Sequence, residues 1–152
     1  MIKVLVPFDG SKNSELAIQQ VANQYMKDRN VEVHVLNVQP PLSRHVAAFL
    51  SGGVRKAFHR DMAAEALRPA RELLDRWGVP YTCHTAMGRK AESIVECAKR
   101  LHCAEIVMGT ARKNSLTRLI EDSVTNRVLE IATVPVRVIA GTAVSKLERY
   151  GI

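Results

Sequence analysis

At 152 residues, with 47% hydrophobic and 24% charged residues, the chain has the size and composition of one globular domain. No apolar run approaches the roughly 18 residues of a membrane span, and no signal-peptide pattern opens the sequence, so we expect a cytoplasmic protein with no membrane partner. The net charge of +7 permits polyanion binding, but 5% aromatic residues are too few for base-stacking platforms, and nucleic acid is not an expected partner.

Apolar runs of strand length alternate with helical patterns along the chain. The first run ends at Asp9, after which Gly10 can make the turn and Ser11 can cap a helix. The predicted strands cover residues 2–8, 31–38, 81–86, 105–108 and 136–140. The predicted helices lie between Ser11 and a polar turn at 28–30, then at 54–77, at about 90–101, and at 123–131.

Between the second strand and the long helix, residues 42–53 are expected to form a loose loop with one short helical turn. Helical spacing within 54–77 predicts one inward apolar face. That face carries Phe58, Met62, Ala66, Ala70, Leu73 or Leu74, and Trp77.

Alternation of strands and helices predicts an α/β fold with a five-stranded parallel sheet, doubly wound by helices on both faces. Ligands of such sheets bind outside the carboxyl ends of the strands. Asp9 and Gly109 follow two of these ends, so we expect them to meet in one crevice. Residues 1–141 form the predicted domain, and 142–152 form a polar tail.

The motifs at the strand ends resemble those of the universal stress protein family, and the resemblance covers almost the whole chain. The matching segments are VPFDGS (6–11) with Ser14, VLNV (35–38), IVMGT (106–110), and SVTNRVL (123–129) followed by VPVRVI (134–139). The resemblance implies an adenine nucleotide alpha hydrolase-like fold of the nucleotide-binding type. It also implies a homodimer formed through the last strand, with Val136, Val138 and Ile139 at the interface, which would cover an exposed sheet edge.

Some members of that family bind ATP through Gly-x2-Gly-x9-Gly followed by Ser or Thr. In this chain Gly109 matches the first glycine and Ser123 the hydroxyl residue, but Arg112 and Asp122 replace the other two glycines. Arg112 adds a side chain where backbone approaches phosphate, and Asp122 places a carboxylate where phosphates would bind. One hypothesis is that Arg112 and Asp122 form an ion pair that closes the triphosphate site. The alternative is independent drift of a surface loop.

Seven residues are therefore candidates for contact with a nucleotide. They are Pro7, Asp9, Val38, Met108, Gly109, Ser123 and Val124. Four of them have a structural alternative: Asp9 can accept hydrogen bonds within its own turn, Pro7 and Val38 can pack in the core, and Ser123 can help to cap a helix.

No catalytic constellation or metal-ligand spacing is recognised, and His34 is expected to be a strand-surface residue because no second histidine or cysteine is placed beside it. The resemblance therefore implies a stress-response protein that acts by binding or regulation on an unidentified protein partner. Its ATP site is degraded and no cofactor is expected. One alternative is an ATP-binding sensor or slow ATPase that uses ATP with Mg²⁺, and another is a basic protein-interaction module.

Overall fold

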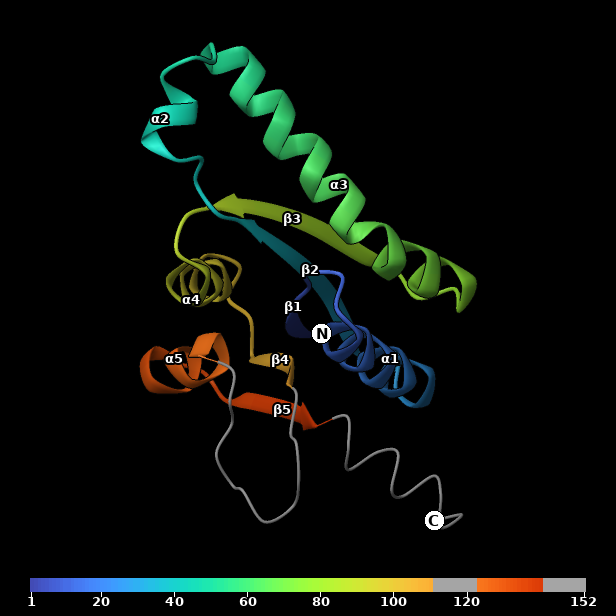
Figure 1. Cartoon of the computed structure of the whole chain (residues 1–152). Coiled ribbons are helices and arrows are strands. Elements are labelled where there is room, and N and C mark those ends of the chain that lie inside the picture. The colour runs from blue at the N-terminus through green and yellow to red at the C-terminus, as the bar shows by residue number, and fades with distance from the viewer. Residues whose placement is uncertain (111–122, 141–152) are drawn as a thin grey trace.

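The computed structural model describes residues 1–110 and 123–140, which form one sheet with helices on both faces (Figure 1). The sheet has five parallel strands in the order β3-β2-β1-β4-β5. The strands are β1 (Ile2–Pro7), β2 (Val31–Gln39), β3 (Tyr81–Met87), β4 (Glu105–Thr110) and β5 (Val136–Ala140). The order reverses between β1 and β4, so a crevice opens at their carboxyl ends.

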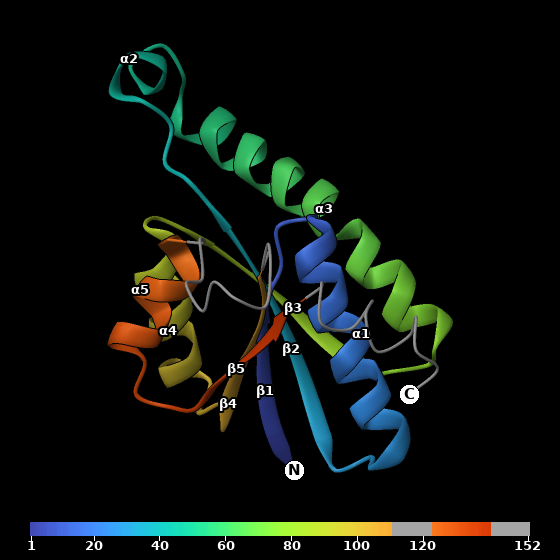
Figure 2. The ribbon, with the colours of Figure 1, turned by 60° about the horizontal axis from the view of Figure 1, so that its bottom comes forward.

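Within the described residues, two helices cover each face of the sheet, which the two views of the ribbon show (Figures 1 and 2). Helices α1 (Lys12–Lys27) and α3 (Gly52–Arg76) lie on one face, and α4 (Lys90–Arg100) and α5 (Ser123–Ile131) lie on the other. The short helix α2 (Arg44–Ala47) and the first turns of α3 project beyond the carboxyl ends of β2 and β3. The predicted doubly wound parallel sheet is confirmed.

Each face of the sheet packs its own apolar core, because successive side chains of a strand point to opposite faces. On β2, Val33 and Val35 join the core beneath α1 and α3, whereas Leu36 and Val38 join the core beneath α4 and α5. Strand β1 divides its residues in the same way and is buried on both sides, as central parallel strands are.

The inward face of α3 differs from the predicted one. Phe58, Met62 and Trp77 are 40–45% exposed, and the buried residues of the helix are Ala63, Leu67, Ala70 and Leu74. Both sets of residues have helical spacing. The observed set faces the sheet because the small side chains of Ala63 and Ala70 let the helix lie close to it. The predicted face was therefore wrong except at Ala70 and Leu74.

Helix α3 also begins two residues earlier than its apolar pattern indicates. Ser51 is the N-cap, and its hydroxyl accepts a hydrogen bond from the Val54 amide at 3.2 Å, which satisfies one free donor of the first turn. The one helical turn expected within residues 42–53 is α2, capped by Ser43. In the described part of the chain, no helix is both long and apolar enough to cross a bilayer. The division at residue 141 stays a prediction, since 141–152 lie outside that part.

Candidate functional site

A cavity of about 210 Å³ lies at the carboxyl ends of β1, β2 and β4, where the strand order reverses. Six of the seven candidate residues line it, and they come from four elements, β1, β2, β4 and α5, and from the β1–α1 loop. These six are Pro7, Asp9, Val38, Met108, Gly109 and Val124. The cavity is smaller than the roughly 300–1,000 Å³ of common ligand pockets, so its described walls suit a small or partly enclosed ligand.

Two hydrogen bonds between β1 and β2 fix the position of Asp9 at the rim of this cavity. The Phe8 amide donates to the Leu36 carbonyl at 2.8 Å. The buried Asn37 side chain donates through Nδ2 to the Phe8 carbonyl at 2.9 Å. These bonds extend the strand pairing past Pro7, and Gly10 then takes the left-handed φ of 86° that turns the chain into α1.

The Asp9 carboxylate is held in one orientation by the start of α1. Its Oδ1 atom accepts from the Ser11 amide and from the Ser14 hydroxyl, each at 2.9 Å. Partial burial raises the pKa of Asp9, but the hydrogen bonds from Ser11 and Ser14, with the charge of Lys90, outweigh it and leave the pKa below its ordinary value. Asp9 therefore carries a negative charge at neutral pH and is preorganised to accept hydrogen bonds from a ligand.

Gly109 has a packing role in addition to its place in the cavity wall. A Cβ atom built on Gly109 would lie 1.7 Å from the Asn13 carbonyl oxygen and 2.3 Å from the Asn13 carbonyl carbon. Because those atoms belong to the backbone of α1, they cannot move aside as a flexible side chain would. The close approach of α1 to β4 is sufficient reason for a glycine here, whether or not a phosphate binds.

Sequence reasoning did not select Lys90, which lies at the start of α4 and lines the same cavity. Its ammonium charge lowers the pKa of Asp9, so the two groups face a common space. The signal that could have found Lys90 is its position directly after the β3–α4 turn, at the carboxyl edge where ligands of parallel sheets bind. The cavity thus combines apolar side chains with polar ones, among them one carboxylate and one ammonium group.

The side chains of three residues of the nucleotide-binding hypothesis lie outside what the structure describes. Arg112 and Asp122 lie outside the described residues, so their proposed ion pair stays a hypothesis. Ser123 is the first residue of α5, and the next residue, Val124, lines the cavity. The side chain of Ser123 also lies outside what is described.

The prediction that His34 is an isolated surface histidine was wrong. His34 is 6% exposed, and its Nδ1 atom lies 2.8 Å from Nε2 of His84 on the neighbouring strand β3. The other ring nitrogen of His34 lies 3.2 Å from Oε1 of Glu32. No cluster of three or more His, Cys, Asp or Glu side chains within residues 1–110 and 123–140 has metal-binding geometry. The histidine pair is therefore a feature of the sheet and lies apart from the cavity.

Comparison with known proteins agrees with the fold and with the family motifs. A profile of the Universal stress protein family matches residues 1–140. Universal stress protein MJ0531 of Methanocaldococcus jannaschii is 31% identical over 140 residues, which covers 90% of this chain and 81% of that protein. Stress response protein NhaX of Bacillus subtilis is 26% identical over 161 residues, covering 90% and 96% of the two chains.

Solved structures establish the shared fold at lower identity. Universal stress protein UspA from Lactobacillus plantarum superposes with a TM-score of 0.70 at 21% identity, over 91% of this chain and 97% of that chain. The Archaeoglobus fulgidus universal stress protein in complex with dAMP gives 0.67 at 22% identity, over 91% and 98%. An Arabidopsis thaliana universal stress protein family protein with AMP bound gives 0.64 at 18% identity, over 92% of each chain. With the five-stranded sheet, the strand-end cavity and the profile match over residues 1–140 in agreement, this chain belongs to the universal stress protein family.

Proposed function

We propose that the protein is a cytoplasmic stress-response regulator that binds an adenine nucleotide or nucleoside at the β1–β4 crevice and binds ATP weakly or not at all. Catalytic turnover is not part of the proposed role. The observation that carries the proposal is the small cavity itself, whose apolar side chains lie beside an ionised Asp9 and a cationic Lys90.

The chemistry of the cavity supports a nucleoside ligand. The side chains of Pro7, Val38 and Val124 offer apolar surface to a flat base. The Asp9 carboxylate is a suitable acceptor for two vicinal hydroxyl groups of a ribose, because it is charged and already held by Ser11 and Ser14. Two relatives were solved with AMP and with dAMP, and each of these nucleotides has one phosphate group. Their ligands support a nucleotide with fewer phosphates than ATP.

The sequence supports a weakened triphosphate site. Asp122 would bring a carboxylate to the N-terminus of α5, where free amides and the helix dipole otherwise favour phosphate. Two like charges about 4 Å apart repel by roughly 1 kcal/mol in water and about 4 kcal/mol near a protein surface. A repulsion in that range lowers ATP affinity by about five-fold to several hundred-fold.

Titration calorimetry with adenosine, AMP and ATP, the last with Mg²⁺, tests the proposal. We expect AMP to bind more tightly than ATP, and Asp9→Asn to weaken both because it removes the charged acceptor. The double variant Arg112→Gly with Asp122→Gly should gain ATP affinity by about ten-fold or more. Asp61→Asn, which removes an exposed acid on α3, serves as the matched control and should change neither affinity.

Two results would favour the alternatives. A thermal shift of several degrees for the native protein at millimolar ATP with Mg²⁺ would make it an ATP sensor or slow ATPase, in which Arg112 binds phosphate in place of backbone amides. No binding of any of the three ligands would leave the basic protein-interaction module. Salt-dependent capture of an acidic partner would support that reading.

We also propose a homodimer through β5. Strand β5 pairs only with β4 in the described sheet, and its residues Val136, Val138 and Ile139 are all partly exposed. Antiparallel pairing with β5 of a second copy would satisfy the open hydrogen-bonding edge. Sedimentation equilibrium tests this, and Val138→Pro, which removes a backbone donor from the strand, should shift the protein to monomer.

A further inference from the structure

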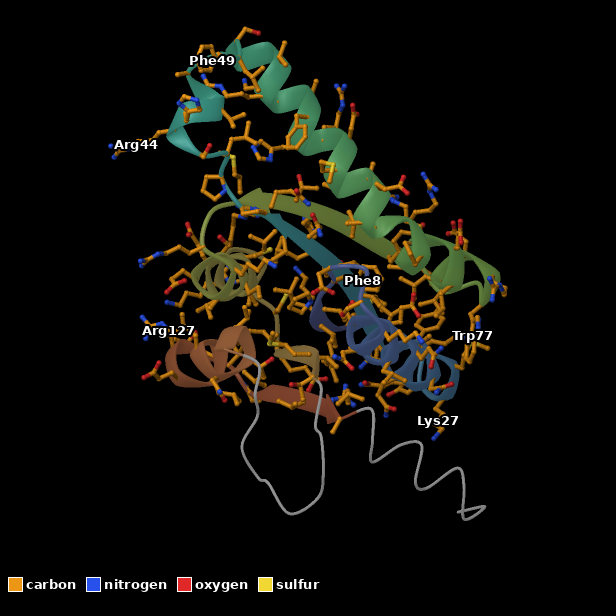
Figure 3. The ribbon with its side chains drawn as sticks, viewed as in Figure 1. Phe8, Lys27, Arg44, Phe49, Trp77 and Arg127 are labelled. Atoms are coloured by element: carbon orange, nitrogen blue, oxygen red, sulfur yellow. The ribbon has the colours of Figure 1, made fainter. Side chains whose placement is uncertain are left out.

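A second and larger cavity lies on the other side of β2, between the α2–α3 projection and the ends of β2 and β3. Its volume is about 550 Å³, within the range of pockets that bind small molecules. It shares no lining residue with the β1–β4 cavity. Figure 3 shows how this part of the molecule stands away from the sheet, with Phe49 at the tip and Arg44 directed outward from α2.

One wall of this cavity is a basic stripe along the first turns of α3. Its residues follow helical spacing, so they share one face of the helix. They are Gly52, Arg55, Lys56, His59 and Arg60. The same face continues into Ala63, Leu67, Ala70 and Leu74, which pack in the core. The inward face of α3 is thus apolar where it meets the sheet and cationic where it meets the cavity.

Two of the three cationic residues on this wall, Arg55 and Lys56, have no acid beside them among the residues that the structure describes. Residues 40–60 contain four Arg and Lys residues and no Asp or Glu. Within the described part of the chain, no carboxylate lies within 4 Å of the Arg55 or Lys56 head groups, whereas Arg60 pairs with Asp61 at 3.5 Å. The Nδ1 atom of His59 is buried and has no hydrogen-bond partner among the described residues. An anionic ligand group would supply a hydrogen-bond partner for His59 Nδ1 and a counter-charge for Arg55 and Lys56.

The opposite wall is mostly apolar, with Gln39 and Thr85 as its polar residues. It is formed by Pro41 and Leu42 from the chain after β2, Ala47 from α2, and Ala86 and Met87 from the end of β3. Burial of apolar ligand surface against these side chains favours binding. The cavity therefore offers an apolar contact on one side and positive charge on the other.

We propose that the cavity between α2, α3 and the β2–β3 ends binds a small amphipathic anion, in which an apolar chain or ring carries one carboxylate or similar acidic head group. Arg55 and Lys56 bind the acidic head, and His59 supplies a further hydrogen bond. The apolar body lies against Leu42, Ala47 and Ala86. This site is independent of the nucleotide site, and the two ligands bind without competition.

Fluorescence titration with anilinonaphthalene sulfonate, an aromatic anion that brightens in apolar surroundings, tests the proposal. We expect saturable binding, displacement of the probe by decanoate, and displacement by decanol that is at least ten-fold weaker. Millimolar ATP or AMP should leave the probe in place. Displacement by the nucleotides as effective as that by decanoate would locate the probe in the β1–β4 cavity and overturn the proposal.

Variants separate charge from shape. The double variant Arg55→Glu with Lys56→Glu should lower the affinity for decanoate by about ten-fold or more, while the affinity for decanol stays unchanged. Acidic residues in the first turns of a helix favour its macrodipole, so this variant should fold. The matched control, Lys27→Glu with Arg76→Glu, makes the same change of charge at distant helix ends and should bind like the native protein. Ala47→Trp should fill the cavity and weaken the binding of both decanoate and decanol.

Two further results would contradict the proposal. Equal affinity for decanoate in the native protein and in the Arg55→Glu, Lys56→Glu variant would show that the stripe does not bind the head group. Cosedimentation with phosphatidylglycerol vesicles, without displacement of the probe by free decanoate, would assign the α2–α3 projection to a membrane surface instead of a soluble anion.

Discussion

Nδ1 of His34 lies 2.8 Å from Nε2 of His84, and the two rings stack with their centroids 5.1 Å apart. Only one proton fits between the two nitrogens, so one ring donates and the other accepts. If His34 donates through Nε2 to Glu32, its Nδ1 is the acceptor and His84 is the donor. This arrangement holds β2 and β3 together on the face that packs against α4.

The histidine pair predicts that the protein loses stability in mild acid. Burial lowers the pKa of His84 below its ordinary value of 6.5, and the nearby His34 and Arg100 lower it further. Between the lowered pKa and 6.5, the unfolded chain binds more protons than the folded one, so stability rises with pH in this window. The contribution is complete above pH 6.5 and is lost as the pH falls below it.

Thermal unfolding at a series of pH values from neutral to mildly acidic measures this effect. We expect the midpoint of the native protein to fall with pH, and His84→Gln to flatten that fall because Gln does not titrate. His102→Asn is the control, because His102 has a φ of 56°, which Asn adopts readily, and it lies outside the pair. A native slope that is unchanged in His84→Gln would contradict the assignment.

Gly109→Ala should destabilise the fold by about 3 kcal/mol or more, because the new methyl group would overlap the Asn13 backbone. Urea unfolding measures the loss. Gly53→Ala is the matched control, because the new methyl group would lie 4.0 Å from the Ser51 hydroxyl oxygen. Ala in place of Gly within a helix adds up to about 1 kcal/mol of stability. A mild effect at Gly109 would mean that the α1–β4 contact can relax.

Local patterns in the sequence predicted the sheet and the crevice but not the contacts between distant segments. The strands and the turn at Asp9 follow from neighbouring residues, since apolar runs, Gly10 and capping serines act over a few positions. The approach of Lys90 to Asp9 joins residues 81 positions apart in the chain, and the His34–His84 pair joins residues 50 apart. Such pairs depend on strand order and register, which no local pattern contains.

The inward face of α3 shows the same limit within a single helix. Leu67→Ala should cost about 2–5 kcal/mol in the free energy of unfolding, because Leu67 is 1% exposed and its loss leaves a cavity. Met62→Ala, at a side chain that is 45% exposed, should change stability by about 0.5 kcal/mol or less. Urea unfolding of both variants distinguishes the observed face from the one that the sequence predicted. A larger loss of stability in Met62→Ala than in Leu67→Ala would contradict the observed face and support the predicted one.

Asp9 also makes the stability of the folded protein depend on pH, in a more acidic range than the histidine pair does. Its lowered pKa means that the folded state favours the carboxylate, so this contribution is present above the ordinary value of 3.8 and is lost as the pH falls through the lowered pKa. Asp9→Asn should cost about 1 kcal/mol or less at neutral pH, since Asn keeps an oxygen acceptor for the Ser11 amide and solvent screens the charge.

Urea unfolding at neutral and acidic pH tests this link, with Asp61→Asn as the control for loss of one exposed acid. The native protein and Asp61→Asn should lose stability in parallel as the pH falls, whereas Asp9→Asn should lose less. Because the same carboxylate is the proposed ribose acceptor, Asp9→Asn should also weaken AMP while it leaves decanoate binding unchanged. An equal loss of both ligands would mean that the two cavities are coupled through β2.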